Sequence, residues 1–419
     1  MLRAPVLRAA LVTALSLALP VASAAAAEFA APDAPGPALS VTSKQLSDAL
    51  LCSKGIDEAS RAPVLLFQGT GATAKDNWSW TYEPALDMAG IPWCAVDLPD
   101  HATSDVQRSG EYVVAAIREV HRRAGRKVSI IGHSQGGMVP RWALRFWPDT
   151  RAMVDDVIGF APSNHGTTEA KCSAEDPCSA AGWQQGDQAN FIRALNSSAE
   201  TWPGIDYTVA YTRTDETVKP NMDDKGSSSL RTGGGTIRNV MTQSVCPNDA
   251  YEHLMIGTVD PVAHALAIDA LEHPGPADPA RLNPLEICGL PYHRGVNTLT
   301  VANDSSMAVA SFESYKPKTV AAEPKLECYV TATCSSSAAN APRPRSCTSK
   351  RRFTVRLPAL RGLRVSLAGK RLAVRRGSGR SRAVVDLRGR PRQTVALRVT
   401  GRDARGRRVT QTRRYRTCG

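Results

Sequence analysis

The chain has 419 residues, with 52 Lys or Arg, 39 Asp or Glu and a formal net charge of +13 at pH 7. This length suits one α/β domain of enzyme size plus a smaller domain, and after the N-terminus no stretch reaches the about 18 apolar residues of a membrane span. The charge is uneven, because residues 341–419 hold 25 Lys or Arg and 2 Asp or Glu, which leaves the rest of the chain acidic.

The first 27 residues have the pattern of a secretory signal peptide. Arg3 and Arg8 provide a basic start, residues 9–21 are apolar, and small residues at 22–27 are typical of a cleavage site. We therefore expect the mature protein to be secreted.

The ten cysteines are consistent with an oxidising destination, because an even number of cysteines in a secreted chain indicates disulfides. Spacing alone does not fix the pairing. Proximity in sequence favours the pairs 52–94, 172–178, 246–288, 328–334 and 347–418. No C-x-x-C or H-x-x-x-H spacing is present, so neither a metal nor a cofactor is expected.

Apolar runs alternate with helix-type patterns over residues 63–272. This alternation predicts a doubly wound, mostly parallel α/β sheet within a domain covering residues 28–334. Strands are expected at 63–68, 91–96, 128–131, 154–160, 205–211 and 237–241, and helices at 43–52 (with Ser43 as the cap), 112–120, 138–146, 188–195 and 262–271.

The composition changes towards the C-terminus. Residues 335–346 are rich in Ser, Ala and Pro and are expected to be a linker. Residues 347–419 are predicted to form a small basic all-β domain of sandwich type. Its runs of β-type residues lie at 353–357, 363–367, 372–375, 383–387, 394–399 and 409–415.

The charge of this small domain indicates an anionic surface, such as lipid head groups, as a partner. Phe353 and Tyr415 are its only aromatic residues, so base stacking would be scarce and nucleic acid is not expected.

The stretch 128–138 carries the strongest functional signal. It reads as a buried strand, the G-x-S-x-G pattern at 132–136, and the start of a helix. In such an elbow the serine, here Ser134, is exposed as a nucleophile, and the backbone N–H of Gln135 can stabilise an oxyanion. The small-residue loop after the strand 63–68 offers a second oxyanion donor at Thr70.

A serine nucleophile needs a base and an acid, which in α/β-hydrolases follow it in the order Asp or Glu, then His. Asp215 comes directly after the strand 205–211 and is the predicted acid, with Glu216 as its nearest rival. His253 follows the strand 237–241 and is the predicted base. His273 and His293, in late loops, stay open as alternatives. His133 lies too close to Ser134 to act as base and is expected to wall the substrate pocket.

Residues 40–293 resemble the Candida antarctica lipase B family of α/β-hydrolases. The similarity is carried by PVLLFQGTGAT at 63–73, SQG at 134–136, FAP at 160–162, WQQ at 183–185 and TDE at 214–216, and by two cysteine pairs 42 positions apart. The resemblance implies the triad Ser134, Asp215 and His253, an oxyanion hole of Thr70 and Gln135, and substrate contacts from Gln185, Thr217 and Val218.

The sequence departs from that family in three places. His133 stands where the lipase has Trp, which implies a roomier and more polar pocket. Residues 170–182 differ from the family's short helical lid, and the basic C-terminal domain has no counterpart there.

The function expected from these patterns is hydrolysis of carboxylic esters of lipids at an interface, as by a triacylglycerol lipase or carboxylesterase. A polyester- or cutin-type esterase and a non-catalytic surface-binding protein on a hydrolase scaffold are the alternatives. The sequence leaves the oligomeric state open.

Overall fold

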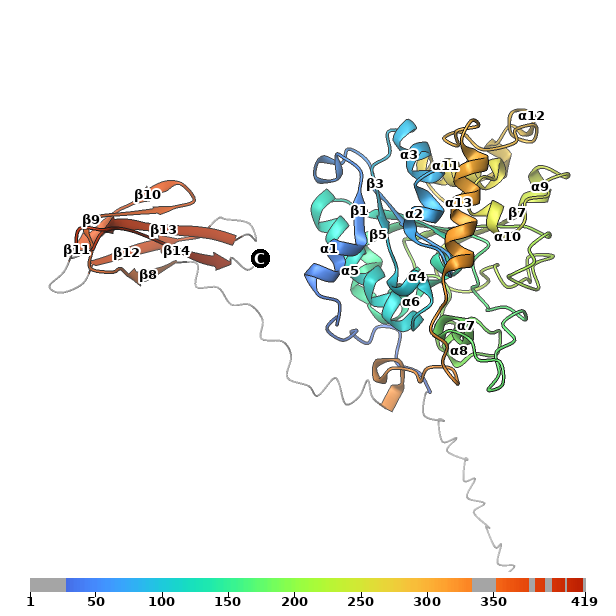
Figure 1. The fold of residues 1–419 in the computed structure, drawn as a ribbon, viewed down its shortest axis with the longest axis horizontal. Coiled ribbons are helices and arrows are strands. Elements are labelled where there is room, and N and C mark those ends of the chain that lie inside the picture. The colour runs from blue at the N-terminus through green and yellow to red at the C-terminus, as the bar shows by residue number, and fades with distance from the viewer. Residues whose placement is uncertain (1–27, 334–351, 377–380, 389–393, 404, 417–419) are drawn as a thin grey trace, which may run out of the picture. The chain divides into compact units, whose positions relative to one another are not determined.

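The computed structural model describes residues 28–333, 352–376, 381–388, 394–403 and 405–416 (Figure 1). The expected signal peptide and linker lie outside these ranges, as do Cys334, Cys347 and Cys418. The chain divides into two compact units, residues 1–339 and 340–419.

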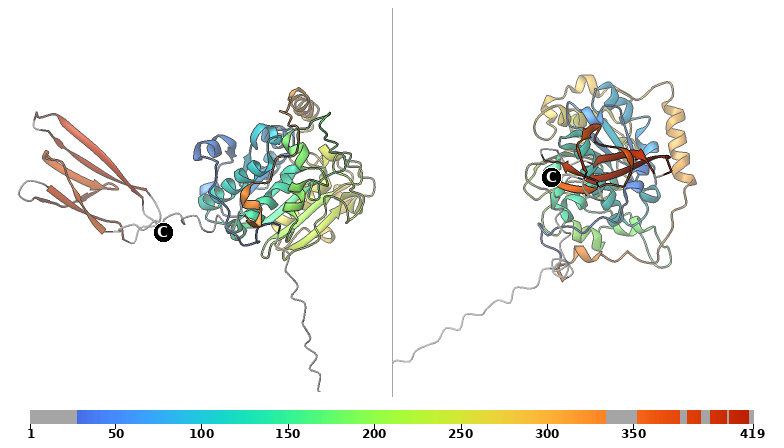
Figure 2. Two further views of the ribbon diagram at one scale, coloured as in Figure 1. Left: turned by 90° about the horizontal axis from the view of Figure 1, so that it is seen from below. Right: turned by 90° about the vertical axis from the view of Figure 1, so that its left-hand side faces the viewer.

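The first unit is built around a seven-stranded sheet, whose position among the helices can be followed in Figures 1 and 2. All neighbouring strands are parallel except β1 and β3, which pair antiparallel. The sheet confirms the prediction of a mostly parallel α/β fold. Its strand order is β1 (Leu50–Cys52), β3 (Trp93–Val96), β2 (Val64–Phe67), β4 (Val128–His133), β5 (Val154–Phe160), β6 (Asp206–Tyr211) and β7 (Thr236–Met241).

Helices cover both faces of this sheet (Figure 2). The α-helices are α1 (Ser43–Ala49), α2 (Ala74–Trp78), α3 (Tyr82–Met88), α4 (Pro99–Ala102), α5 (Val106–Ala124), α6 (Gln135–Phe146), α7 (Ala180–Gln184), α8 (Asn190–Leu195), α9 (Thr242–Val245), α10 (His253–Ile256), α11 (Pro261–Glu272), α12 (Pro284–Ile287) and α13 (Val301–Ser314). Short 3₁₀ turns occur at Ile56–Glu58, Pro148–Met153, Pro279–Arg281 and Cys328–Val330.

The run of apolar residues in β2 shows why the sheet is buried on both sides. Leu65 and Phe67 point into a core with α5, α6 and α8, whereas Val64 and Leu66 point into a second core with α2, α3 and α11. Side chains alternate between the two faces of a strand, so a continuous apolar run fits a sheet covered on both faces.

The first helix differs from the prediction in its cap and in its end. Thr42, not Ser43, is the N-cap, because its hydroxyl accepts from the backbone N–H of Gln45 and the Gln45 side chain reciprocates. The helix stops at Ala49, and residues 50–52 extend into β1 along β3.

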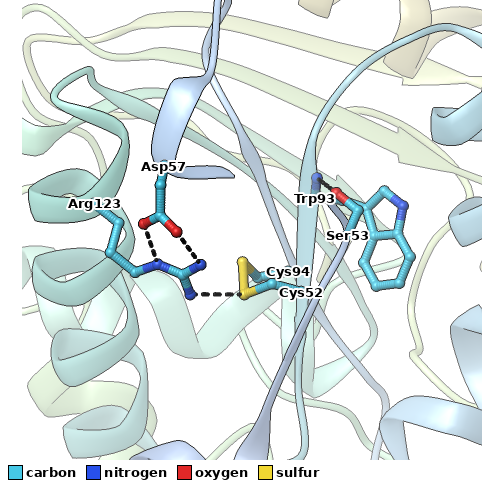
Figure 3. Close-up of a disulfide and its surroundings, with 6 residues drawn as sticks. All are labelled: Cys52, Ser53, Asp57, Trp93, Cys94 and Arg123. Atoms are coloured by element: carbon cyan, nitrogen blue, oxygen red, sulfur yellow. Dashed lines mark hydrogen bonds and ion pairs between the residues drawn. A yellow bond between two sulfur atoms is a disulfide. The ribbon is translucent and has the colours of Figure 1, made fainter. Parts of the chain in front are cut away.

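Three disulfides pair as proximity in sequence suggested: Cys52–Cys94, Cys172–Cys178 and Cys246–Cys288. The first joins β1 to β3 beside the pair formed by Arg123 and Asp57, whose guanidinium and carboxylate lie 2.8 Å apart (Figure 3). Cys328 is also disulfide-bonded.

Residues His253–Glu272, which span α10 and α11, are long and apolar enough to cross a membrane by length and composition. However, 67% of their apolar window is buried inside the unit. Side chains such as Val262 and Leu266 pack in the second core, so the stretch forms part of the core of this unit.

The second unit consists of two antiparallel sheets around its own apolar core, which confirms the prediction of a small all-β domain. The predicted run 372–375 is in fact two strands in different sheets. The four-stranded sheet has the order β10 (Lys370–Leu372), β9 (Arg361–Leu367), β13 (Thr394–Arg402) and β14 (Arg408–Arg416), and the three-stranded sheet β11 (Val374–Arg376), β12 (Ser381–Asp386) and β8 (Arg352–Arg356).

Candidate active site

Ser134 occupies a sharp turn between β4 and α6. Its backbone has φ 54° and ψ −122°, a conformation that is strained for a residue with a side chain, and strain of this kind is concentrated at functional sites. The flanking glycines make the turn possible, because a Cβ at Gly132 would lie 2.0 Å from the carbonyl oxygen of Gly136. Ser134 also precedes the first N–H groups of α6, which have no acceptor within a helix.

Asp215 lies beyond the end of β6 and is held by four donors. Oδ1 accepts from the backbone N–H groups of Thr217 at 2.9 Å and Val218 at 2.7 Å, and Oδ2 accepts from the side-chain amide of Asn221 at 3.2 Å. The fourth donor is His253. Burial raises the pKa of Asp215, but the bond and charge of His253 and the two backbone N–H groups outweigh it, so the pKa is lowered from the ordinary value of an aspartate.

His253 is the first residue of α10, and Nδ1 of its ring lies 3.0 Å from both carboxylate oxygens of Asp215. The Glu252 side chain caps this short helix and so fixes where the helix begins, and with it the position of His253. The backbone N–H of His253 also donates to the carboxylate of Glu216 at 3.2 Å. Glu216 thus holds the backbone of His253, while Asp215 holds its ring.

The loop after β2 is fixed by two glutamine side chains. Nε2 of Gln135 and Nε2 of Gln185 each lie 2.9 Å from the hydroxyl oxygen of Thr70. A hydroxyl has two lone pairs and one proton, so these two donors use both acceptor positions of Thr70. The O–H of Thr70 is thereby left to donate.

A buried asparagine that the sequence analysis missed connects the loops around the site. Oδ1 of Asn77 accepts from the backbone N–H of Gly69 at 3.1 Å, and its Nδ2 donates to the carbonyl of Gly257 at 3.2 Å. The signal in the sequence is the Thr73-x-x-Asp76 capping box, which starts α2 and sets the position of Asn77 on it.

The ring of His133 lies between the side chain of Asn77 and the backbone of His253. Its Nδ1 lies 3.1 Å from Oδ1 of Asn77, and its Nε2 lies 2.9 Å from the carbonyl oxygen of His253. Burial, followed by the nearby His253, lowers the pKa of His133 to about 3, so the ring is neutral near pH 7. A neutral imidazole has one N–H and therefore donates to one of these two oxygens.

Two segments flank the Thr70 loop. The backbone at Asp100, His101 and Ala102 has positive φ, and the carbonyl of His101 accepts from the N–H of Gly71 at 2.7 Å. On the other side, the ring of Phe312 in α13 lies so close that a Cβ at Gly71 would be 2.3 Å from it. The sequence patterns predict no element over residues 301–314, where α13 lies.

The other histidines have different surroundings. His264 and His293 stack on each other with centroids 4.4 Å apart, His165 pairs with Glu200 at 3.0 Å, and His273 pairs with Asp269 at 3.3 Å. Nδ1 of His121 lies 2.6 Å from the carbonyl of Arg126. Of the eight histidines, which all lie in the described ranges, His253 is the one paired with Asp215.

The predicted site residues thus come from the ends of parallel strands at one edge of the sheet. Thr70 follows β2, Ser134 follows β4, Asp215 follows β6 and His253 follows β7. Thr217 and Val218 orient Asp215 through their N–H groups. No group of three or more His, Cys, Asp or Glu that could hold a metal ion is found among the described residues.

Three comparisons with known proteins bear on this arrangement. The family model for lipase (class 2) matches residues 104–255. Lipase B of Pseudozyma antarctica is 30% identical over 217 residues, which are 51% of this chain. The crystal structure of Aspergillus fumigatus lipase B superposes with a TM-score of 0.64 at 28% identity, covering 71% of this chain and 74% of that one.

The chain has the α/β-hydrolase fold and is similar to lipase B-like proteins over part of its length. The match spans 63% of the length of the Pseudozyma antarctica protein, somewhat less than two thirds. The family model begins just before α5 and ends just after His253.

Proposed function

We propose that this chain is a secreted serine hydrolase that cleaves carboxylic ester bonds of lipids through Ser134, Asp215 and His253. The observation that carries the proposal is the buried Asp215–His253 pair at the same sheet edge as the strained Ser134, in a chain similar to lipase B of Pseudozyma antarctica. The disulfides and the basic-apolar N-terminus support secretion.

In the proposed mechanism, Nε2 of His253 removes the hydroxyl proton of Ser134 as Oγ attacks the ester carbonyl. Asp215 fixes the tautomer by accepting from Nδ1 and stabilises the imidazolium that forms. His253 then protonates the leaving alcohol, and an acyl-enzyme remains on Ser134. A water molecule, deprotonated by His253, releases the acid and regenerates the serine.

The oxyanion of the tetrahedral intermediate would be stabilised by the O–H of Thr70 and the N–H of Gln135. The two glutamine amides that occupy the lone pairs of Thr70 support this role, because they orient its proton before the substrate arrives. Donors that are fixed in advance need no reorganisation as charge develops.

A lipid substrate is favoured by apolar side chains exposed next to the site. Leu254 and Met255 follow His253 directly, and Phe312 lies over the Thr70 loop. Burying an acyl chain against such side chains is favourable by about 25 cal/mol per Å².

The test is the variant Ser134→Ala, measured on p-nitrophenyl esters of rising chain length and on emulsified triacylglycerol. We expect kcat to fall at least ~10³-fold with little change in thermal stability. Ser47→Ala, an exposed serine on α1, is the matched control and should keep full activity.

An organophosphonate probe separates an enzyme from a non-catalytic scaffold, because it labels only an activated serine. Covalent labelling of the wild-type chain, lost in Ser134→Ala, is expected. Ester hydrolysis that persists in Ser134→Ala would exclude the proposed mechanism, and an unlabelled, inactive wild-type chain would favour the scaffold reading.

A further inference from the structure

The second unit carries a row of arginines on the outer face of its four-stranded sheet. Val365, Leu367, Leu397 and Val399 are buried in its core, so the residues that alternate with them face outward. The strand register then places Arg402 and five further exposed arginines on this outer face: Arg364, Arg371, Arg398, Arg408 and Arg414. We call these five residues the arginine face.

Hydroxyl side chains lie between these arginines. Ser366 is opposite both Arg371 and Arg398, Thr400 is opposite Arg364, and Thr412 is opposite Arg398. Among the described residues of these four strands, no acidic side chain is present. The face therefore combines positive charge with neutral hydrogen-bonding groups.

None of the five arginines forms a salt bridge or a side-chain hydrogen bond with any described residue. The two aspartates of this unit pair elsewhere: Asp386 with Arg388 at 2.7 Å and Asp403 with Arg407 at 3.0 Å. Arg402 lies directly opposite Arg408, an arrangement of like charges that costs stability. An uncompensated face of this kind is stabilised when an anionic partner covers it.

We propose that the arginine face docks the protein on an anionic phospholipid surface. A β-sheet face is broad and shallow, so it matches a plane of head groups better than the groove of a duplex. Guanidinium groups form paired hydrogen bonds with phosphate oxygens, and the interspersed hydroxyls can donate to the same groups.

Two observations separate this partner from nucleic acid and from a membrane-inserted anchor. Both aromatic rings of the unit, Phe353 and Tyr415, pack on each other against the core, with centroids 5.0 Å apart, so they are not available to stack bases. Among the described residues of the unit, the exposed large apolar side chain is Val384, which lies on the other sheet. Docking is therefore peripheral and electrostatic.

The experiment compares two triple variants of the full-length chain. Arg364→Gln, Arg398→Gln and Arg414→Gln together remove three charges from the arginine face. The matched control replaces Arg356, Arg375 and Arg382 by Gln. These three arginines form an exposed row across the three-stranded sheet and are equally free of salt bridges.

Binding is measured by cosedimentation with phosphatidylcholine vesicles that contain about 30% phosphatidylglycerol, at low salt. Each arginine near such a surface contributes about fivefold in affinity, so the arginine-face variant should lose about 100-fold in its partition coefficient. The control variant should lose less than about tenfold, and wild-type binding should vanish at about 0.5 M salt.

Equal losses in the two variants would overturn the assignment to this face, as would wild-type binding that is unaffected by salt. Tighter binding of a DNA duplex than of vesicles, at the same phosphate concentration, would overturn the choice of lipid. Cosedimentation requires no hydrolysis, so this result is independent of the proposed function. Far-UV circular dichroism and hydrolysis of a short soluble ester should be unchanged in both variants.

Discussion

Asn77 connects the loops that carry the proposed oxyanion donor and the histidine, so its removal should affect catalysis as well as stability. Asn77→Ala leaves the N–H of Gly69 and the carbonyl of Gly257 without their partner, at a site where the asparagine is 3% exposed. Each buried polar group left unpaired costs about 1–3 kcal/mol, so for the two groups we expect a loss of about 2–6 kcal/mol in the free energy of unfolding.

The catalytic effect follows from the position of Gly69, which directly precedes Thr70. A displacement of about 1 Å in a reacting group can reduce turnover about 10²-fold, so we expect kcat to fall by about 10- to 100-fold. The loss in kcat should exceed any change in KM, because the oxyanion forms only in the transition state.

The matched control is Asn239→Ala. The Asn239 side chain also bonds one backbone N–H and one carbonyl, both of Leu230, at 3.0 and 2.8 Å, but it lies on β7 away from the site. Thermal unfolding and hydrolysis of a p-nitrophenyl ester are measured on both variants. If both lose stability and Asn77→Ala keeps kcat within about twofold of the control, the proposed link between Asn77 and catalysis is wrong.

Two further predictions concern stability. Replacing Cys52 and Cys94 together by Ala opens a loop of 42 residues, which by loop entropy should lower the free energy of unfolding by about 4 kcal/mol. Chemical denaturation measures this loss. A loss no larger than that from opening Cys172–Cys178, a separation of 6, would contradict this account. Burial raises the pKa of Asp156 to about 7, although its bond from Ser129 opposes the shift. Because the folded pKa lies above the unfolded value, ionising Asp156 destabilises the fold as the pH rises from about 4 to above 7, so Asp156→Asn should gain stability over wild type at pH 8 but not at pH 4. Equal effects of this substitution at both pH values, measured by urea unfolding, would show that the carboxyl does not titrate as described.

The parts of the fold that were predicted correctly are those encoded in a local pattern. The apolar run 154–160 predicts both ends of β5, and the glycines around Ser134 predict the sharp turn between β4 and α6. Chain order, together with the position of each residue after a predicted strand, favoured Asp215 and His253 as partners, and the structure places their side chains 3.0 Å apart. That pairing required no knowledge of the loops between them.

Asn77 was missed because one of its partners, Gly257, is 180 positions away in sequence, and the capping box that starts α2 does not indicate what the Asn77 side chain bonds. The run 372–375 has the pattern of one strand because β10 and β11 share the same alternation. Which sheet each strand joins depends on the partners that it meets after folding.

The short strand β1 has a consequence for how the protein behaves at high concentration. An open sheet exposes unpaired backbone groups along its outermost strands, and these groups can recruit a strand from another molecule and start aggregation. Here the edge strand β1 is only three residues long, pairs antiparallel with its neighbour β3 and is linked to it by the Cys52–Cys94 disulfide. A reducing environment would break this disulfide and leave β1 held to β3 by hydrogen bonds alone. The protein should therefore stay monodisperse longest under oxidising conditions.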